Sequence, residues 1–275
     1  MSKNMPELPE VETIKKDLAK LIVGRKVLGI ETNSPKQVQP SLAAVQKTIV
    51  GTTVKKVQRR AKILQIFFSN GSIVIIHLKL TGRLLVRKKG AKIDDWQHIT
   101  VALSGGKELR FADSRKFGWF RLLKNEKELK KILKDFGPEP LDDLTLPIFR
   151  HILSSTSRPV KIILMDPKRI SGVGNIYASE ALFLAGIDPR RPSNKISLKE
   201  AQKLYDDLEK VLKLGLKYRG ASDQYYLDAL GHKGAYQKHF LVYGQQGKKC
   251  PSCPQMIKRI VLGGRGTFYC PACQK

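Results

Sequence analysis

Four cysteines near the end of the chain have the spacing of a metal site. They form two pairs, CPSC and CPAC, with sixteen residues between the pairs: Cys250, Cys253, Cys270 and Cys273. Two residues between the cysteines of a pair let both thiolates reach a single tetrahedral zinc ion. Two disulfides are the alternative, but the chain shows no secretory signal and has no other cysteine. We therefore expect one structural Zn2+.

The segment between the cysteine pairs predicts a β-hairpin. It contains IKRIVLGGRGTFY, in which two β-prone runs flank the turn sequence GGRG. Because four thiolates leave no open coordination position, we expect the ion to hold this hairpin and to take no part in catalysis. Arg265 would then lie at the hairpin tip.

The charge of the chain predicts a polyanionic partner. Its 51 Lys and Arg residues outnumber 24 Asp and Glu residues, for a formal net charge of +27 over 275 residues. Solubility of a small domain needs a magnitude of only about 2–8. Nucleic acid is the first candidate, and a solvated basic surface is the alternative on charge alone. A membrane surface fits less well, since the basic residues are spread along the whole chain.

No run of about eighteen apolar residues is present, so we expect no transmembrane helix and a cytoplasmic location.

The first half of the chain has the texture of a β-domain. Apolar residues at helical spacing predict a helix over 6–23, and a charged helix is expected over 125–135. Between them, short β-prone runs separated by turns such as SNG and SGG predict a sandwich or barrel of antiparallel strands. These runs are KVLGIET, AKILQIFF, SIVIIHLKL, HITVAL, ELRFAD and WFRLLK.

The second half changes to helical periodicity after the stiff segment FGPEPLDDLTLP, which predicts a linker between domains. Ser197 and Glu200 form a capping-box sequence before a long amphipathic helix. A shorter helix, NIYASEALFLAG, follows a turn that contains Gly172 and Gly174.

Seven motifs, in this order and spacing, resemble the formamidopyrimidine-DNA glycosylases, which are bifunctional repair enzymes that excise oxidised purines. They are MPELPEVE, RRAK, HLKLTGRL, DSRKFG, GVGNIYASEALF, VYGQQGKKC and GRGTFYCPACQ, and they extend from Pro6 to the end of the chain. The related endonuclease VIII branch shares the architecture but typically begins Pro-Glu-Gly-Pro-Glu. Leu8 stands at the glycine position here and favours the purine branch.

The resemblance implies an α+β fold of two domains. Residues 1–135 would form an N-terminal helix and an antiparallel β-sandwich, and 136–145 the linker. Residues 146–240 would form a helix–two-turn–helix DNA-binding domain, in which 218–236 close over the lesion, and 241–275 a zinc-ribbon hairpin. The expected partner is double-stranded DNA with oxidised bases or abasic sites, bound between the domains by a monomer at the nucleoid.

The resemblance also implies a catalytic set. An α-amino group titrates at about 8, so an N-terminal proline is a workable nucleophile that attacks C1′ and forms a Schiff base. This role falls to Pro6, and that of general acid and base to Glu7. Lys62 matches the lysine of β-elimination, and Arg265 the arginine that grips phosphate and assists δ-elimination. Without the resemblance, PELPE is typical of a helix start, and Lys62 of a basic strand edge.

Further positions match residues that hold the DNA backbone. His77 and Asn175 correspond to two backbone clamps at the lesion, although an isolated histidine is more often structural and Asn175 also suits a helix cap. Lys161 is a weaker candidate for the same phosphate-binding face. His98 is a further predicted DNA-binding residue.

Three positions match the side chains that fill the space left by an extruded base: Leu80, Arg115 and Phe117. Phe117 can wedge between bases, and Arg115 can hydrogen-bond the orphaned partner. Position 80 is often methionine in the family, and DSRKFG is often DPRRFG. Since leucine and methionine have similar volumes, we expect the function to survive.

Whether residues 1–5 remain on the chain decides whether Pro6 can act as a nucleophile. If residues 1–5 persist, the nitrogen of Pro6 is a tertiary amide and cannot attack C1′. We expect translation to start at Met5, so that removal of the initiator exposes the amine. The alternatives are a damaged-DNA-binding protein that retains residues 1–5 and is catalytically blocked, or an endonuclease VIII-like enzyme for oxidised pyrimidines.

Overall fold

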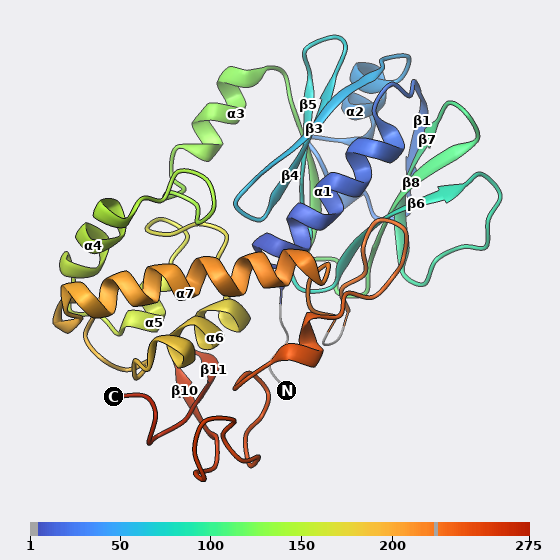
Figure 1. Ribbon diagram of the computed structural model, residues 1–275. Coiled ribbons are helices and arrows are strands. Elements are labelled where there is room, and N and C mark those ends of the chain that lie inside the picture. Colours follow the sequence, from blue (N-terminus) through green and yellow to red (C-terminus); the bar gives the residue numbers. More distant parts are fainter. Residues whose placement is uncertain (1–4, 223–224) are drawn as a thin grey trace.

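Helix α1 (Leu8–Ile22) forms where the sequence predicted a helix over 6–23, and it lies between the two halves of the molecule (Figure 1). The computed structural model describes residues 5–222 and 225–275. Pro9 occupies the first turn, where its missing N–H leaves no helix bond unmade. The helix contacts both strand β3 (Val54–Arg60) and helix α7 (Leu198–Lys217), so it belongs to both domains.

The N-terminal domain is built from two sheets. Their strand orders are β1-β7-β8-β6 and β2-β9-β5-β4-β3, and every pairing is antiparallel except that of β2 with β9. The predicted antiparallel sandwich is therefore present, with one parallel pair. The remaining strands are β1 (Val27–Thr32), β2 (Val38–Gln39), β4 (Ile63–Phe68), β5 (Ile73–His77), β6 (Gly82–Lys88), β7 (Gln97–Leu103), β8 (Lys107–Asp113) and β9 (Trp119–Leu123).

The two-residue strand β2 was not among the predicted runs, and neither were the longer strands β3 and β6, which both form sheet edges. Their sequences, VKKVQRR and GRLLVRK, carry the lysines and arginines that protect an edge from pairing with another chain. The run SIVIIHLKL ends as a strand at His77, because Lys79 has a left-handed backbone with φ of +53°. Leu80 therefore lies in a turn.

The helical half packs around α6 and α7, and α7 is the longest helix (Figure 1). The capping box predicted at Ser197 and Glu200 is formed, with Glu200 accepting from the Ser197 backbone N–H at 2.8 Å. The other helices are α2 (Leu42–Ile49), α3 (Glu126–Leu133), α4 (Leu146–Ser154), α5 (Val160–Leu164), α6 (Asn175–Ala185) and the 3-10 turns Pro35–Gln37, Ser193–Lys195 and Tyr236–His239. Strands β10 (Lys258–Leu262) and β11 (Arg265–Tyr269) form the predicted hairpin.

Each domain has its own apolar core, and residues from the opposite half enter both. Leu8 packs in the core of the helical domain, whereas Val11 and Ile14 of the same helix pack in the sandwich core. In return, Tyr226 and Ala229 lie in the sandwich core. The two domains are therefore joined by burial of apolar side chains, and the predicted α+β chain of two domains is confirmed.

The segment between the domains is held by the arginines of the RRAK motif. Arg59 lies 2.8 Å from the Glu139 carboxylate, which is 1% exposed, and Arg60 lies 2.8 Å from Asp143. Charge-assisted pairs of this kind fix direction as well as distance. Among the described residues, no helix is long and apolar enough to cross a bilayer.

We expect Ser197→Ala to lower the free energy of unfolding by about 1 kcal/mol, because the Ser197 hydroxyl accepts the backbone N–H of Glu200 at the start of α7. Urea unfolding measures this change. Thr145→Ala is the matched control, since Thr145 begins α4 without a side-chain capping bond. Equal losses in the two variants would contradict the assigned role of the Ser197 hydroxyl.

Candidate active site

Glu7 lies where the first turns of two helices meet. It precedes α1, and its carboxylate accepts backbone N–H groups of Ile176 and Tyr177, in the first turn of α6, at 2.9 and 3.5 Å. Only 2% of its surface is exposed. Unpaired N–H groups and the helix dipole make a helix start favourable for a negative group. The two helices therefore fix one carboxylate at the boundary between the domains.

The glycines before α6 make this approach possible. A Cβ atom at Gly174 would lie 2.4 Å from the carboxyl carbon of Glu7. Gly172 has φ of +89°, and its carbonyl accepts the backbone N–H of Leu8 at 3.0 Å. Gly174 is therefore required by the close approach of the Glu7 carboxyl group, and Gly172 by a left-handed turn.

Burial raises the pKa of Glu7 from 4.5 to about 7. Lys62 and the two backbone N–H groups oppose this shift, and the nearby carboxylate of Glu10 adds to it. A carboxyl group with this pKa can both donate and accept a proton near neutral pH, as general acid–base catalysis requires.

The side chain of Lys62 extends from the sandwich domain toward the turn before α6, where Glu7 also lies. Its ammonium donates to the carbonyl of Val173 at 3.0 Å. Its position follows from the preceding residue, because Ala61 has φ of +53° and its backbone N–H donates to Glu139. Burial lowers the pKa of Lys62, with Glu7 and Glu10 acting in the opposite direction. A lowered pKa makes the amine a better proton acceptor at neutral pH.

His77 ends β5 and is held in one orientation. Its Nδ1 accepts the backbone N–H of Lys79 at 3.0 Å, and its ring lies 5.8 Å from that of Trp119. Burial, helped by Lys79 and Lys62, lowers the pKa of His77 to about 3. The imidazole is therefore neutral at physiological pH, and because Nδ1 is an acceptor, its proton is on Nε2. The side chain can donate one hydrogen bond through that atom.

Asn175 and Arg265 approach from the helical domain. The amide of Asn175, at the start of α6, donates to the carbonyl of Gly266 at 3.0 Å, so it ties α6 to the hairpin. Arg265 begins β11 and is exposed. Within residues 5–222 and 225–275, no hydrogen bond or ion pair engages its guanidinium group, whose donors are thus available to a phosphate.

A cavity of about 450 Å3 between the domains brings many of the predicted residues together. Seven of them line it: Glu7, Lys62, His77, Leu80, Phe117, Asn175 and Arg265. Met5 lines it as well, and Pro6, between Met5 and Glu7, is buried. Residues far apart in the sequence thus share one pocket at the domain boundary.

The segment 113–118 carries two of the predicted void-filling side chains. Phe117 is 53% exposed, and the guanidinium carbon of Arg115 lies 4.6 Å from the centre of its ring. Asp113, which the sequence analysis did not select, holds this segment, since its buried carboxylate accepts the N–H groups of Arg115 and Gly118 at 3.2 and 2.7 Å. The sequence could have indicated this role, because an Asp followed by Ser and Gly is typical of a turn.

Three predicted DNA-binding residues do not line the cavity: Arg115, which lies beside Phe117, and His98 and Lys161. His98 contacts Asn33 through Nδ1 at 2.8 Å and the carbonyl of Asp113 through Nε2 at 3.2 Å. Its ring therefore supports the 113–118 segment at Asp113. Lys161 is fully buried, and its ammonium donates to the hydroxyl of Thr267 at 2.8 Å. Burial lowers the pKa of Lys161 to about 7. It joins α5 to β11 and is not presented at the surface.

A second acidic residue of PELPE is also part of the site. The carboxylate of Glu10 is 2% exposed and accepts from the backbone of Glu7, the hydroxyl of Tyr177 and the backbone of Ala221, each at 2.8 Å. Our sequence analysis treated it as one of the acids favoured at a helix start. Ala221 lies in the predicted lesion-closing segment, of which Asp223 and Gln224 lie outside the described residues, as do residues 1–4.

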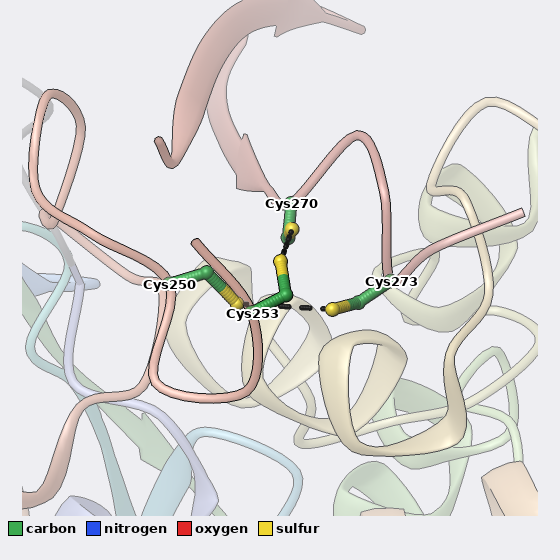
Figure 2. A group of neighbouring side chains, drawn as sticks. All are labelled: Cys250, Cys253, Cys270 and Cys273. Atoms are coloured by element: carbon green, nitrogen blue, oxygen red, sulfur yellow. Dashed lines mark hydrogen bonds between the residues drawn. The ribbon is translucent and has the colours of Figure 1, made fainter. Parts of the chain in front are cut away.

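The four cysteines converge on one point below the hairpin (Figure 2). All four sulfur atoms lie within 4.8 Å of one another, with Cys250 and Cys273 at 3.8 Å and Cys253 and Cys270 at 3.4 Å. These distances exceed the S–S bond of a disulfide, about 2.05 Å. A zinc tetrahedron with Zn–S bonds of about 2.3 Å has edges of about 3.8 Å. The cysteines therefore form one structural zinc site, as predicted.

The zinc site supports the cavity at a distance. The end of the chain is bonded to the end of α6, because the backbone N–H of Lys275 donates to the carbonyl of Gly186 at 3.0 Å and the amide of Gln274 donates to that of Ile187 at 2.9 Å. The metal thus holds the hairpin against the helix whose other end binds Glu7. This arrangement places Arg265 at the cavity.

We expect a zinc chelator to release one zinc ion per chain and to expose the amides of β10 and β11 to hydrogen exchange, while β4 stays protected. Structural zinc sites supply much of the folding free energy of small hairpins. Elemental analysis and exchange mass spectrometry measure both effects. Cys250→Ser should reproduce them and Ser252→Ala, in the same turn, should not. Unchanged protection of the hairpin after metal loss would contradict the structural role.

We expect Glu7→Gln to stabilise the protein more at about pH 8.5 than at about pH 5. A carboxyl group whose pKa is raised on folding contributes stability below its unfolded value of 4.5, and this contribution is lost as the pH rises through about 7. The shift corresponds to about 2–3 kcal/mol between the two conditions. Urea unfolding of both proteins at both pH values measures it. A difference that does not change with pH would show that Glu7 titrates normally.

Comparison with known families accounts for most of the chain. The model described as "Formamidopyrimidine-DNA glycosylase N-terminal domain" matches residues 5–120, and that described as "Formamidopyrimidine-DNA glycosylase H2TH domain" matches residues 136–226. The model "Zinc finger found in FPG and IleRS" matches residues 247–275, which include all four cysteines.

Curated relatives and solved structures agree with these matches. The formamidopyrimidine-DNA glycosylase of Carboxydothermus hydrogenoformans is 40% identical over 273 residues, which cover 98% of this chain and all of that protein. That of Bacillus cereus is 34% identical and covers 98% of this chain and 99% of its own length. The Lactococcus lactis enzyme, Fpg, in complex with DNA that contains an abasic site, superposes with a TM-score of 0.92 at 34% identity, over 98% of this chain and 99% of the other. Together with the cavity and the zinc site, these matches show that the chain belongs to the formamidopyrimidine-DNA glycosylase family and is a DNA glycosylase of DNA repair.

Proposed function

We propose that this protein excises oxidised purines from double-stranded DNA and then cleaves the strand at the resulting abasic site. The observation that carries the proposal is the cavity that joins Glu7, whose pKa lies near 7, with Lys62 and Arg265 from distant parts of the chain. Relatives support the substrate class, because Lactococcus lactis Fpg has been solved with an abasic site and with a benzylated formamidopyrimidine, Fapy-dG. The proposed substrates are 8-oxoguanine and formamidopyrimidines.

The proposed reaction begins at the nitrogen of Pro6. Its lone pair forms a bond to C1′ of the damaged nucleotide, the glycosidic bond breaks, and the base leaves with the bonding electrons. The proline nitrogen then loses its proton, its lone pair breaks the C1′–O4′ bond of the sugar ring, and O4′ takes a proton from Glu7. The product is a cationic Schiff base between the opened sugar and the proline. Glu7 shuttles protons at the sugar ring, for which a pKa near 7 is suited.

Strand cleavage follows from the Schiff base by β- and δ-elimination. The positive charge on nitrogen makes the sugar easier to deprotonate, and the phosphates leave in turn. Lys62 is proposed to act in β-elimination, since its amine lies in the cavity and has a lowered pKa. Arg265 is proposed to bind phosphate and to assist δ-elimination, because its exposed planar group can engage two phosphate oxygens.

The remaining predicted residues in and beside the cavity are proposed to hold the DNA. The neutral imidazole of His77 donates through Nε2 to a backbone phosphate, and Asn175 acts beside it. Leu80, Arg115 and Phe117 fill the space that the extruded base leaves in the stack. The half-buried Leu80 and the exposed Phe117 both face the cavity that would receive the lesion.

The active form is proposed to begin at Pro6. In the full chain the carbonyl of Met5 makes the Pro6 nitrogen an amide, and Met5 itself lines the cavity. A start at Met5 followed by removal of that residue gives the free secondary amine. A single chain supplies every residue in this scheme, so we propose that the enzyme acts as a monomer, on chromosomal DNA at the nucleoid.

Oxidised pyrimidines are a second candidate substrate class. Lactococcus lactis Fpg has also been solved with DNA that contains an oxidised pyrimidine, with a TM-score of 0.91 to this chain at 34% identity. Leu8 still favours the purine branch, since the endonuclease VIII branch typically has glycine at this position. A clear preference for thymine glycol over 8-oxoguanine duplexes would overturn the purine assignment.

We expect borohydride to trap a covalent complex between an 8-oxoguanine duplex and the chain that begins at Pro6, because reduction fixes the Schiff base. Mass spectrometry of the adduct should place it on Pro6. The chain that keeps residues 1–5 should bind the DNA and give no adduct. Absence of an adduct from both forms would leave a damaged-DNA-binding protein and refute the enzymatic proposal.

Lys62→Ala provides a second arm of this test, with Lys130→Ala as the control. Lys130 is exposed on α3 and does not line the cavity, but its replacement by alanine removes the same positive charge. We expect strand cleavage to fall by about tenfold or more in Lys62→Ala, as general acid–base groups typically contribute about 100-fold or more. Equal cleavage rates in the two variants would refute the role of Lys62.

A further inference from the structure

A short segment of the helical domain is anchored on the sandwich domain. Residues 225–231, called the strap below, pass beside β6, which is the edge of its sheet (Figure 1). Tyr226 and Ala229 are buried in the sandwich core, and the backbone N–H of Val86 on β6 donates to the carbonyl of Ala229 at 2.8 Å. The strap is therefore bonded to the edge of the sheet from outside its own domain.

Charged side chains fix both sides of the strap. Arg219, which precedes it, lies 2.7 Å from Asp17 on α1 and 2.6 Å from the buried Asp228 within the strap. Arg87 on β6 donates to the carbonyl of Leu230 at 2.9 Å. These bonds connect the strap to two elements of the sandwich domain, so its path is set by that domain.

Arg83 fixes the beginning of the strap. Its Nε, from β6, donates to the carbonyl of Tyr225 at 2.8 Å. Tyr225 follows directly after Asp223 and Gln224 in the predicted lesion-closing segment, 218–236. Arg83 therefore holds Tyr225, the first residue of the strap, on the sandwich domain.

Trp96 connects this point with the 113–118 segment. Its ring is 51% exposed, and the guanidinium carbon of Arg83 lies 5.8 Å from the ring centre. Its backbone is left-handed, with φ of +59°, which is unfavourable for a bulky side chain and is often found at functional sites. The Trp96 carbonyl accepts the backbone N–H of Asp113 at 2.9 Å, and Asp113 orders the segment that carries Arg115 and Phe117.

We propose that Arg83 and Trp96 are positioning residues for damage recognition, which hold the strap in fixed register with the 113–118 segment. The inference rests on the proposed function and names two residues that determine its specificity. Neither side chain lines the catalytic cavity. Arg83 acts through its hydrogen bond to Tyr225, and Trp96 acts through its hydrogen bond with Asp113.

The inference separates two kinds of substrate. A damaged base has to be covered on one side while its place in the stack is filled on the other, so both segments must be in place together. An abasic site has no base to cover. Loss of the Arg83 and Trp96 contacts should therefore impair removal of a damaged base and spare cleavage at an abasic site.

We expect Arg83→Ala to lower kcat/KM for 8-oxoguanine removal by about tenfold or more, because a hydrogen bond from a charged donor is lost. Trp96→Ala should lower it by about two- to fivefold, and Trp96→Phe, which keeps an aromatic face, should restore most of the activity. Cleavage of an abasic duplex should change by less than about twofold in all three. Single-turnover assays on both duplexes, with the chain that begins at Pro6, give these values.

Lys56→Ala is the matched control. Lys56 on β3 also lies over an aromatic ring, 4.1 Å from the centre of Phe67, but at the edge of the other sheet. It should leave both reactions unchanged. If Arg83→Ala reduced both reactions equally, the side chain would serve general DNA binding and the inference would be refuted. No loss in either reaction would refute it as well.

A structural measurement on the full chain tests the same contact without activity. In Arg83→Ala the amide of Val86 should exchange faster with solvent, since its acceptor is the Ala229 carbonyl of the strap. An unchanged Val86 amide would refute the anchoring role. If the wild-type protein cleaved abasic DNA but neither 8-oxoguanine nor formamidopyrimidine duplexes, the proposed function itself would fail, and the inference with it.

Discussion

The active site depends on the burial of one carboxylate, that of Glu7, between the first turns of α1 and α6. The backbone N–H groups of α6 make this burial possible, and the loss of hydration raises the pKa of Glu7 to about 7. The same contact brings the end of the chain that carries Pro6 to the helix that carries Asn175. The position of the Glu7 carboxylate and its raised pKa therefore have the same cause, its burial against the first turn of α6. The arrangement opposes stability at high pH, as expected where function requires an unfavourable group.

Buried carboxylates that accept backbone N–H groups recur across the molecule. Glu10 binds the N–H of Ala221, Glu139 that of Ala61, and Glu180 on α6 those of Leu241, Val242 and Tyr243, at 2.8–3.0 Å for Glu10 and Glu180. Each joins segments that are distant in the sequence. A bond to the backbone fixes the path of the chain and leaves neighbouring side chains free for DNA.

The zinc site fixes the path of the chain on the side of the cavity where Arg265 lies. Its hairpin has few apolar residues of its own to bury, and the metal replaces the core that so short a segment cannot form. Through Lys161 and Thr267 in one place and Asn175 and Gly266 in another, the hairpin is bonded to the helical domain. Arg265 is therefore exposed, and its guanidinium has no partner in the part of the chain that the structure describes, while strand pairing holds its backbone.

The sequence by itself determined the features that depend on local spacing. The cysteine pairs required one metal site, the capping box at Ser197 began α7, and the order of motifs indicated the family and its two domains. It did not show that His98 and Lys161 lie outside the cavity, or that Asp113 and Glu10 organise it. Burial and contact partners decide these roles, and for His98 and Lys161 the partners lie fifteen or more positions away, at Asp113 and Thr267. The raised pKa of Glu7 likewise arises only when its carboxylate is buried between α1 and α6, against the opposing charge of Lys62, because desolvation is a property of the packed structure and not of a residue type.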